Sequence, residues 1–301
     1  MIKRFKYHIV LHIIICIWGF TAILGVFIDA NAFVLVWFRV LIAFVFLFLF
    51  LFITKKNWLI KNRRQTLKTL GVGVLVALHW LTFYLGIKAS SASLLIICMS
   101  TATIHVAWLE PLVMKRRFLP SEFYLGLIII GGIVLITYKG TPEINYLGVG
   151  YGLVSALLAA FFGTFNAKLI HEVSASLITL YEMFSATIVM TLILFFMGEL
   201  TLDKMAISSS DLWYLLFLGV VCTSVAFLVT VEITRFLGAY TVALSINMEP
   251  IYTLGLAIVL LKEHLGLTVS FYIGALVIVS AVFINAFLKV YQSKQFKKTF
   301  I

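Results

Sequence analysis

The stretch "FYIG" at residues 271–274 repeats "FYLG" at residues 123–126, an offset of 148 positions. Earlier positions match at similar offsets: Met248 with Met99, Glu182 with Arg39, and "FGT" at 162–164 with "WGF" at 18–20. The offset drifts by a few residues, as a few loop insertions would allow, and self-similarity at a nearly fixed spacing is typical of a chain built from structural repeats. The sequence therefore predicts two related halves, which we place at residues 1–140 and 141–301.

The composition is that of a protein embedded in a lipid bilayer. Of 301 residues, 63% are hydrophobic and 12% are charged, whereas soluble domains carry roughly 25% charged residues. Stretches of about 20 apolar residues cross the roughly 30 Å of hydrocarbon in a bilayer as helices. We predict an all-α membrane protein with ten such spans, at about 7–28, 32–53, 69–87, 90–113, 122–138, 147–167, 175–197, 211–234, 238–261 and 268–288.

Five spans in each half is an odd number, so the second half must enter the membrane from the opposite side. This predicts the inverted-topology repeat of many secondary transporters, which bind solute near the membrane midplane between the halves. Lys and Arg are enriched in cytoplasmic loops, and residues 54–68 hold six basic side chains and no acidic one. We therefore expect both termini in the cytoplasm and the protein in the cell membrane, plasma or inner.

The net charge of +11 is explained by these basic loops, which face anionic lipid headgroups. Nucleic-acid binding is not needed to account for it. Three cysteines, Cys16, Cys98 and Cys222, lie inside the expected spans without framework spacing, so neither a disulfide nor a metal site is expected. No cofactor motif is present.

The segment "INMEPIYTLG" at 246–255 places Glu249 and Pro250 within an apolar run. A charge at the membrane centre costs about 2.5–3.5 kcal/mol, and such groups usually face a bundle interior or a cavity. On a helix, Ser245 and Tyr252 would share a polar stripe with Glu249, and Pro250 would free the carbonyl of Ile246 for another donor. The alternative is a protonated Glu249 that holds a neighbouring helix beside a static proline kink.

Weaker candidates for the substrate pathway lie on the first four spans. Thr101 and His105 are on span four, the repeat counterpart of span nine, and His79 and Trp80 are neighbours on span three. Trp18 belongs to the "WG" pair of span one. Each of these side chains is equally compatible with helix packing.

Arg39 and Glu182 occupy matching positions of the two halves and carry opposite charges. Across the pseudo-two-fold axis they would form an ion pair that acts either as a gate or as a static brace. Alternatively, Arg39 would bind the carboxylate of a substrate directly.

Taken in order, several motifs resemble the EamA branch of the drug/metabolite transporter superfamily. They are "WG" in span one, "FR" in span two, "LGIKASSASLL" at 85–95, "MEPIYTLGLAIVLLKEHL" at 248–265 and the following "FYIGALVIV". The resemblance implies a central cavity lined by spans three, four, eight and nine, and the export of amino acids, other metabolites or drugs. Members often have a proline in span four where this chain has Thr101, which predicts less flexing of the first half.

Two classes of function follow. A secondary transporter of small organic solutes, with alternating access and with protons as a candidate coupling ion, fits the repeat and the intramembrane carboxylate. The other class is an intramembrane transferase acting on a lipid-linked or membrane substrate. The sequence contains no G-x-x-x-x-G-K-[ST], H-E-x-x-H or G-x-S-x-G motif, so ATP hydrolysis and the commonest hydrolytic centres are not indicated. One Arg, one or two carboxylates and several aromatics suit a zwitterion such as an amino acid, and also a nucleoside or a hydrophobic cation.

Overall fold

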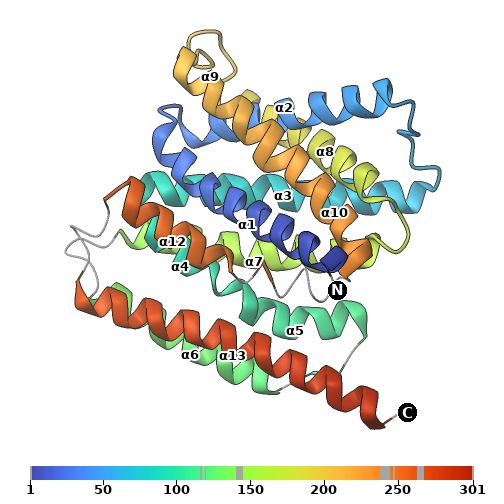
Figure 1. The fold of residues 1–301 in the computed structure, drawn as a ribbon. Helices are drawn as coiled ribbons and strands as arrows, with labels where there is room; N and C mark the ends of the chain where they lie inside the picture. Colours follow the sequence, from blue (N-terminus) through green and yellow to red (C-terminus); the bar gives the residue numbers. More distant parts are fainter. Residues whose placement is uncertain are drawn as a thin grey trace.

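A computed structural model describes residues 2–115, 117–118, 120–139, 145–237, 245–246, 248–262 and 268–299, with side chains for most of them. The described part of the chain is built from helices and connecting segments and contains no strand. Figure 1 shows these helices running roughly side by side as one bundle. The all-helical prediction is therefore confirmed.

The first half begins with three long helices and continues with three shorter ones. They are α1 (Ile2–Phe27), α2 (Ala32–Ile53), α3 (Arg63–Ala89), α4 (Ala92–Met99), α5 (Ala102–Met114) and α6 (Pro120–Lys139). The expected span 90–113 is thus divided into α4 and α5, with a helical break at Ser100 and Thr101.

The second half has the same general plan with a different interruption. Its described helices are α7 (Tyr146–Leu169), α8 (Ala175–Phe196), α9 (Ser209–Leu216), the π-helix η1 (Phe217–Val225), α10 (Ala226–Leu237), α12 (Glu249–Leu260) and α13 (Val269–Thr299). The expected span 211–234 corresponds to α9, η1 and α10 together. Of the expected span 238–261, residues 238–244 and 247 lie outside the described part.

Several of these helices are long and apolar enough to cross a bilayer. Among the described residues, seven helical stretches satisfy this criterion: Lys6–Phe27, Ala32–Ile53, Arg63–Ala89, Ala92–Met114, Tyr146–Leu169, Ala175–Phe196 and Ser209–Thr230. Shorter apolar helices cover Phe123–Gly132, Ile251–Leu260 and Val269–Ala281. Because several spans are present, the chain is a multi-pass membrane protein. The total of ten spans stays a prediction.

Helix α3 lies at the centre of the bundle, where it packs against α7 and α8, while α6 and α13 pair at one edge. The pairing of α6 with α13 depends on small residues, because a Cβ on Gly132 would lie 3.1 Å from the carbonyl oxygen of Gly274. Small residues let helix backbones approach closely in membranes.

Both chain ends lie toward the same end of the bundle, together with the segment that joins α2 to α3 (Figure 1). At the other end, the carboxylate of Asp211 accepts hydrogen bonds of 3.0 Å from the backbone N–H groups of Asp29 and Ala30. Asp211 is only 2% exposed, so it ties the α1–α2 connection to the start of α9.

Candidate functional site

Arg39 is the central group of a buried polar cluster between α2, α3 and η1. Its side chain is 3% exposed. Nε donates a 3.0 Å hydrogen bond to Oγ1 of Thr223, and Nη1 donates one of 3.0 Å to the hydroxyl of Tyr84. The guanidinium carbon lies 3.9 Å from the centre of the Trp80 ring, a cation–π contact that offsets part of the desolvation of the charge.

The guanidinium lacks a carboxylate in direct contact within the described part of the chain. Among the described residues, no ion pair involves Arg39. The arginine does lie within electrostatic range of Glu249 and His79. A buried charge without a counter-charge is destabilising. An anionic group of a ligand would relieve that cost, so a buried Arg held by neutral groups is well suited to bind one.

The π-helix η1 supplies one wall of this cluster. Within it, the hydroxyl of Thr223 donates to the carbonyl of Leu218 at 2.8 Å and thereby directs its lone pairs at Arg39. The carbonyl of Cys222 accepts a 3.1 Å hydrogen bond from Nε1 of Trp18 on α1. Single π-helical turns are frequent at functional sites. Trp18 and Arg39 therefore both form hydrogen bonds with η1.

Glu249 is the first residue of α12, where the positive end of the helix dipole favours a carboxylate. Its side chain is partly buried and accepts no hydrogen bond from any described residue. Pro250 follows it in the first turn of α12, although its side chain lies outside the described part. A proline costs no hydrogen bond at this position. Within the described residues, Pro250 thus lies in the first turn of α12 and follows a turn at Met248.

Tyr252, which we expected to share a polar stripe with Glu249, has a hydrogen-bond partner on another helix. The hydroxyl of Tyr252 shares a 2.9 Å hydrogen bond with Nδ1 of His12 on α1, so this tyrosine fastens α12 to α1. Ser245 lies in a helical segment before α12, and the break at Met248 separates the two helical directions. Its carbonyl accepts from the N–H of Met248 at 2.9 Å.

The break between α4 and α5 centres on Thr101, which is 3% exposed. Its hydroxyl donates to the carbonyl of Cys98 at 2.6 Å, and its N–H bonds the same carbonyl at 3.1 Å. The chain therefore interrupts this span without a proline. His105, one turn into α5, is partly buried.

His79 belongs to a helix contact rather than to the Arg39 cluster. Nδ1 lies 2.9 Å from both oxygens of Ser155 on α7, and the Ser155 hydroxyl lies 3.1 Å from the carbonyl of His79. A neutral imidazole with its proton on Nδ1 donates to the Ser155 carbonyl and leaves the serine hydroxyl free to donate back. The ring also packs at 5.2 Å from Phe162. This geometry favours the packing interpretation of His79.

Glu182 lies on α8, is 1% exposed, and forms no ion pair with Arg39. Its neighbour is Asn166 of α7, within hydrogen-bonding reach. Oε1 of Glu182 and Oδ1 of Asn166 are both buried without a described donor. The repeat relation between Arg39 and Glu182 therefore does not make them a contacting pair.

The structure thus places Trp80 on Arg39 and both Glu249 and His79 within electrostatic range of it, while Trp18 bonds the residue next to Thr223. The hydrogen bonds of His79, Thr101 and Tyr252 are local helix contacts, and the neighbour of Glu182 is Asn166. Sequence reasoning missed Tyr84 and Thr223, the two hydrogen-bond acceptors of Arg39. The sequence marked Tyr84 and Thr223 only as polar residues inside apolar spans. It did not indicate the π-helix that places Thr223 beside α2.

Comparisons with known proteins agree with this membrane architecture. A relative in Salmonella typhimurium (strain LT2), described as "Uncharacterized inner membrane transporter YicL", is 28% identical over 232 residues, which cover 74% of each chain. The "Uncharacterized transporter YdfC" of Bacillus subtilis (strain 168) is 27% identical over 178 residues, 58% of this chain and 56% of that one. A solved crystal structure matches with a TM-score of 0.64 at 13% identity, covering 93% of this chain and 96% of that one, a likeness that shows the fold alone.

The sequence profile described as the "EamA-like transporter family" matches twice, over residues 6–138 and 146–287. These two segments together cover nearly the whole chain. A multi-pass helical bundle, a buried polar cluster between its inner helices and relatives named as transporters all fit that match. This chain belongs to the EamA-like transporter family and is a membrane transporter.

Proposed function

We propose that this transporter exports amino acids or related small zwitterionic metabolites by alternating access. The observation that supports the substrate class is Arg39, a buried guanidinium with no described carboxylate partner and with Glu249 in electrostatic range. A solute carboxylate would complete the coordination of Arg39, and a solute ammonium would lie toward Glu249. Trp80 and Trp18 would contact the apolar part of the solute.

The proposed architecture is ten spans in two inverted five-span repeats, residues 1–140 and 141–301, with both termini in the cytoplasm of a plasma or inner membrane. The position of both termini at one end of the bundle supports this arrangement. The helical breaks at Ser100–Thr101 and at Met248 lie at positions that the repeat offset pairs. Broken helices near the midplane are where many secondary transporters bind solute.

Protons are the proposed coupling ion, with Glu249 as the group that exchanges them. A carboxylate that meets the solute in one state and a proton in another links the two movements, because the differential affinity of each ligand for the two states drives the cycle. Nucleosides and hydrophobic cations are the competing solutes. The intramembrane transferase remains the alternative class, and no contact in the described residues favours it.

The test begins with metabolite profiling of cells with and without the protein, inside and outside, which identifies the solute and the direction together. Counterflow of that solute is then measured in proteoliposomes for the wild type, Arg39→Gln and Arg39→Lys. We expect Arg39→Gln to abolish measurable counterflow and Arg39→Lys to lose at least tenfold, because an ammonium lacks the planar fork that binds a carboxylate bidentately and stacks on Trp80. A solute without a carboxylate, or wild-type counterflow in Arg39→Gln, would rule out the substrate assignment. Conversion of the solute to a product would favour the transferase.

A further inference from the structure

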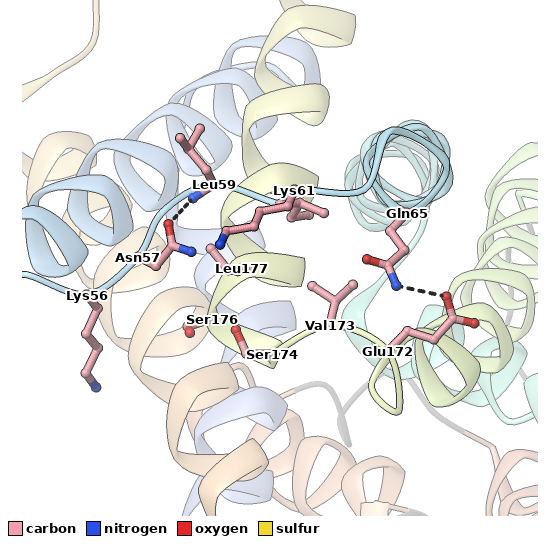
Figure 2. A pocket seen from close by; sticks show the side chains of 11 residues that line it. Lys56, Asn57, Leu59, Lys61, Gln65, Glu172, Val173, Ser174, Ser176 and Leu177 are labelled. Carbon is pink, nitrogen blue, oxygen red and sulfur yellow. Dashed lines mark hydrogen bonds between the residues drawn. The ribbon is translucent and has the colours of Figure 1, made fainter.

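A cavity of about 540 Å³ lies at the end of the bundle where α2 and α7 finish and α3 and α8 begin. None of the residues of the Arg39 cluster lines this cavity. No step of the proposed transport uses it. The polar side chains that line it include Lys56, Lys61, Gln65, Glu172, Ser174 and Ser176. Figure 2 shows Lys61 reaching across the cavity, whereas Lys56 extends outward from its rim.

The cavity has more hydrogen-bond donors than acceptors. Among the described residues, neither Lys56 nor Lys61 forms an ion pair. Its acid, Glu172, is already engaged by Nζ of Lys68 at 3.7 Å and by Nε2 of Gln65 at 3.5 Å. Lys56 lies over the Phe50 ring at 5.6 Å, so Lys61 is the cation that is available to an anion in this cavity.

The start of α8 adds further donors on the opposite side. Ser174 is the N-cap residue of this 22-residue helix, yet its side chain makes no capping hydrogen bond. The hydroxyl of Ser176 likewise has no partner among the described residues. Hydroxyls, first-turn N–H groups and the positive helix end together match the oxygens of a phosphate. Lys61 supplies the charge that a helix end alone lacks.

Apolar side chains beside the cavity place it at the membrane surface. Phe52 and Ile53 at the end of α2 are 65% and 74% exposed, and Trp58 and Leu59 in the following loop are 44% and 50% exposed. The Trp58 ring lies 6.0 Å from that of Phe48 on α2. Tryptophan is enriched where a span meets the headgroup layer, so an acyl chain along this face would bring a headgroup to Lys61.

We propose that this cavity binds the phosphate of an anionic phospholipid headgroup, held by Lys61, the Ser174 and Ser176 hydroxyls and the start of α8. Net negative headgroups are favoured because residues 54–68 carry six basic and no acidic side chains. The inference rests on the proposed membrane placement of this end of the bundle and not on the identity of the solute. A soluble phosphate offers the same oxygens, so the two sources are separated by experiment.

The experiment measures lipid retention by the purified full-length protein with native mass spectrometry. Phosphatidylglycerol and phosphatidylcholine of identical acyl chains are compared for the wild type, Lys61→Gln, Ser176→Ala and the control Lys55→Gln. Lys55 lies in the same loop but does not line the cavity. We expect phosphatidylglycerol to be preferred, with at least tenfold weaker retention in Lys61→Gln and a smaller loss in Ser176→Ala. Lys55→Gln should lose no more than about fivefold, the effect of one basic residue near an anionic surface.

Three results would overturn the proposal. Equal losses in Lys61→Gln and Lys55→Gln would show diffuse charge attraction without a cavity site. Equal retention of phosphatidylcholine would contradict selection of a net negative headgroup. Displacement of phosphatidylglycerol by millimolar inorganic phosphate or glycerol phosphate, sensitive to Lys61→Gln, would assign the cavity to a soluble anion. Since none of these measurements uses transport, their outcome is independent of the proposed export of amino acids.

Discussion

Replacing Glu249 by Gln separates the proposed transport role of this carboxylate from any structural one. The substitution keeps the size of the side chain and one carbonyl acceptor but removes the charge. If Glu249 receives the solute ammonium, solute affinity and the cycle both depend on that charge. We expect counterflow in proteoliposomes to fall at least tenfold, which corresponds to about 1.4 kcal/mol of lost interaction, and the remaining activity to vary less with pH.

The structure predicts a small effect on stability for the same change. No described residue donates a hydrogen bond to the Glu249 carboxylate, and the bond from Thr253 Oγ1 goes to the Glu249 backbone carbonyl, which the variant retains. The principal loss is the interaction of the carboxylate with the α12 dipole, about 0.3–1 kcal/mol. The free energy of unfolding should therefore fall by no more than about 1 kcal/mol.

The matched control is Glu199→Gln, which makes the same chemical change in a carboxylate that pairs with Lys204 outside the bundle at 2.7 Å. Exposed pairs of this kind contribute little to stability, so both stability and counterflow should stay near the wild type. Denaturation in SDS and counterflow are measured on the same preparations. Wild-type counterflow in Glu249→Gln, with an intact pH profile, would refute the reasoning. A loss of several kcal/mol in stability would instead make Glu249 a packing residue.

Three further changes test the packing and the topology. Gly73→Ala should destabilise the bundle by about 2 kcal/mol, because a Cβ there would lie 2.6 Å from Ser185 Cβ and 2.7 Å from the Glu182 carbonyl oxygen. The control Gly71→Ala, whose Cβ would have nothing within 4 Å, should be nearly neutral. Both are measured by denaturation in SDS. Ser155→Ala should cost about 1 kcal/mol, because it removes the hydrogen bond from the Ser155 hydroxyl to the carbonyl of His79 while Nδ1 keeps the Ser155 carbonyl as its acceptor; an unchanged midpoint would show that this contact is dispensable. Reporter tags at residues 60 and 117 should give cytoplasmic signals and tags near 143 and 203 external ones, and an external signal at 117 would contradict the proposed topology.

Sequence reasoning located the helices better than it located their contacts. Apolar length alone placed α2 at 32–53, where the structure has Ala32–Ile53, because the bilayer sets the length of a span. Helix ends outside the hydrocarbon were missed by several residues, as at Arg63, where α3 begins before its apolar part. The partners of a side chain depend on the orientation of its helix about the helix axis and on which helices lie next to it. The apolar pattern of one span does not determine either.

Arg39 illustrates the part of the site that sequence could not supply. Its charge marked it as functional in a membrane span, and that much follows from residue type. The repeat offset suggested Glu182 as its partner, but positions that correspond across two repeats need not touch. In the structure α2 faces η1, where a Cβ on Gly219 would lie 2.7 Å from Ile42 Cγ2. That close approach brings Thr223 to Arg39, whereas the neighbour of Glu182 is Asn166 of α7.

The two helical breaks show how one architectural feature can arise from different residues. In the second half, Pro250 follows the break at Met248 and needs no hydrogen-bond donor at the start of α12. In the first half, the Thr101 hydroxyl and N–H both bond the carbonyl of Cys98, replacing the regular ladder with a tight local turn. Side-chain hydroxyls compete with helical hydrogen bonds in this way. A proline is therefore not necessary for a broken span, and it is not sufficient either, because Pro111 lies inside α5 without interrupting it.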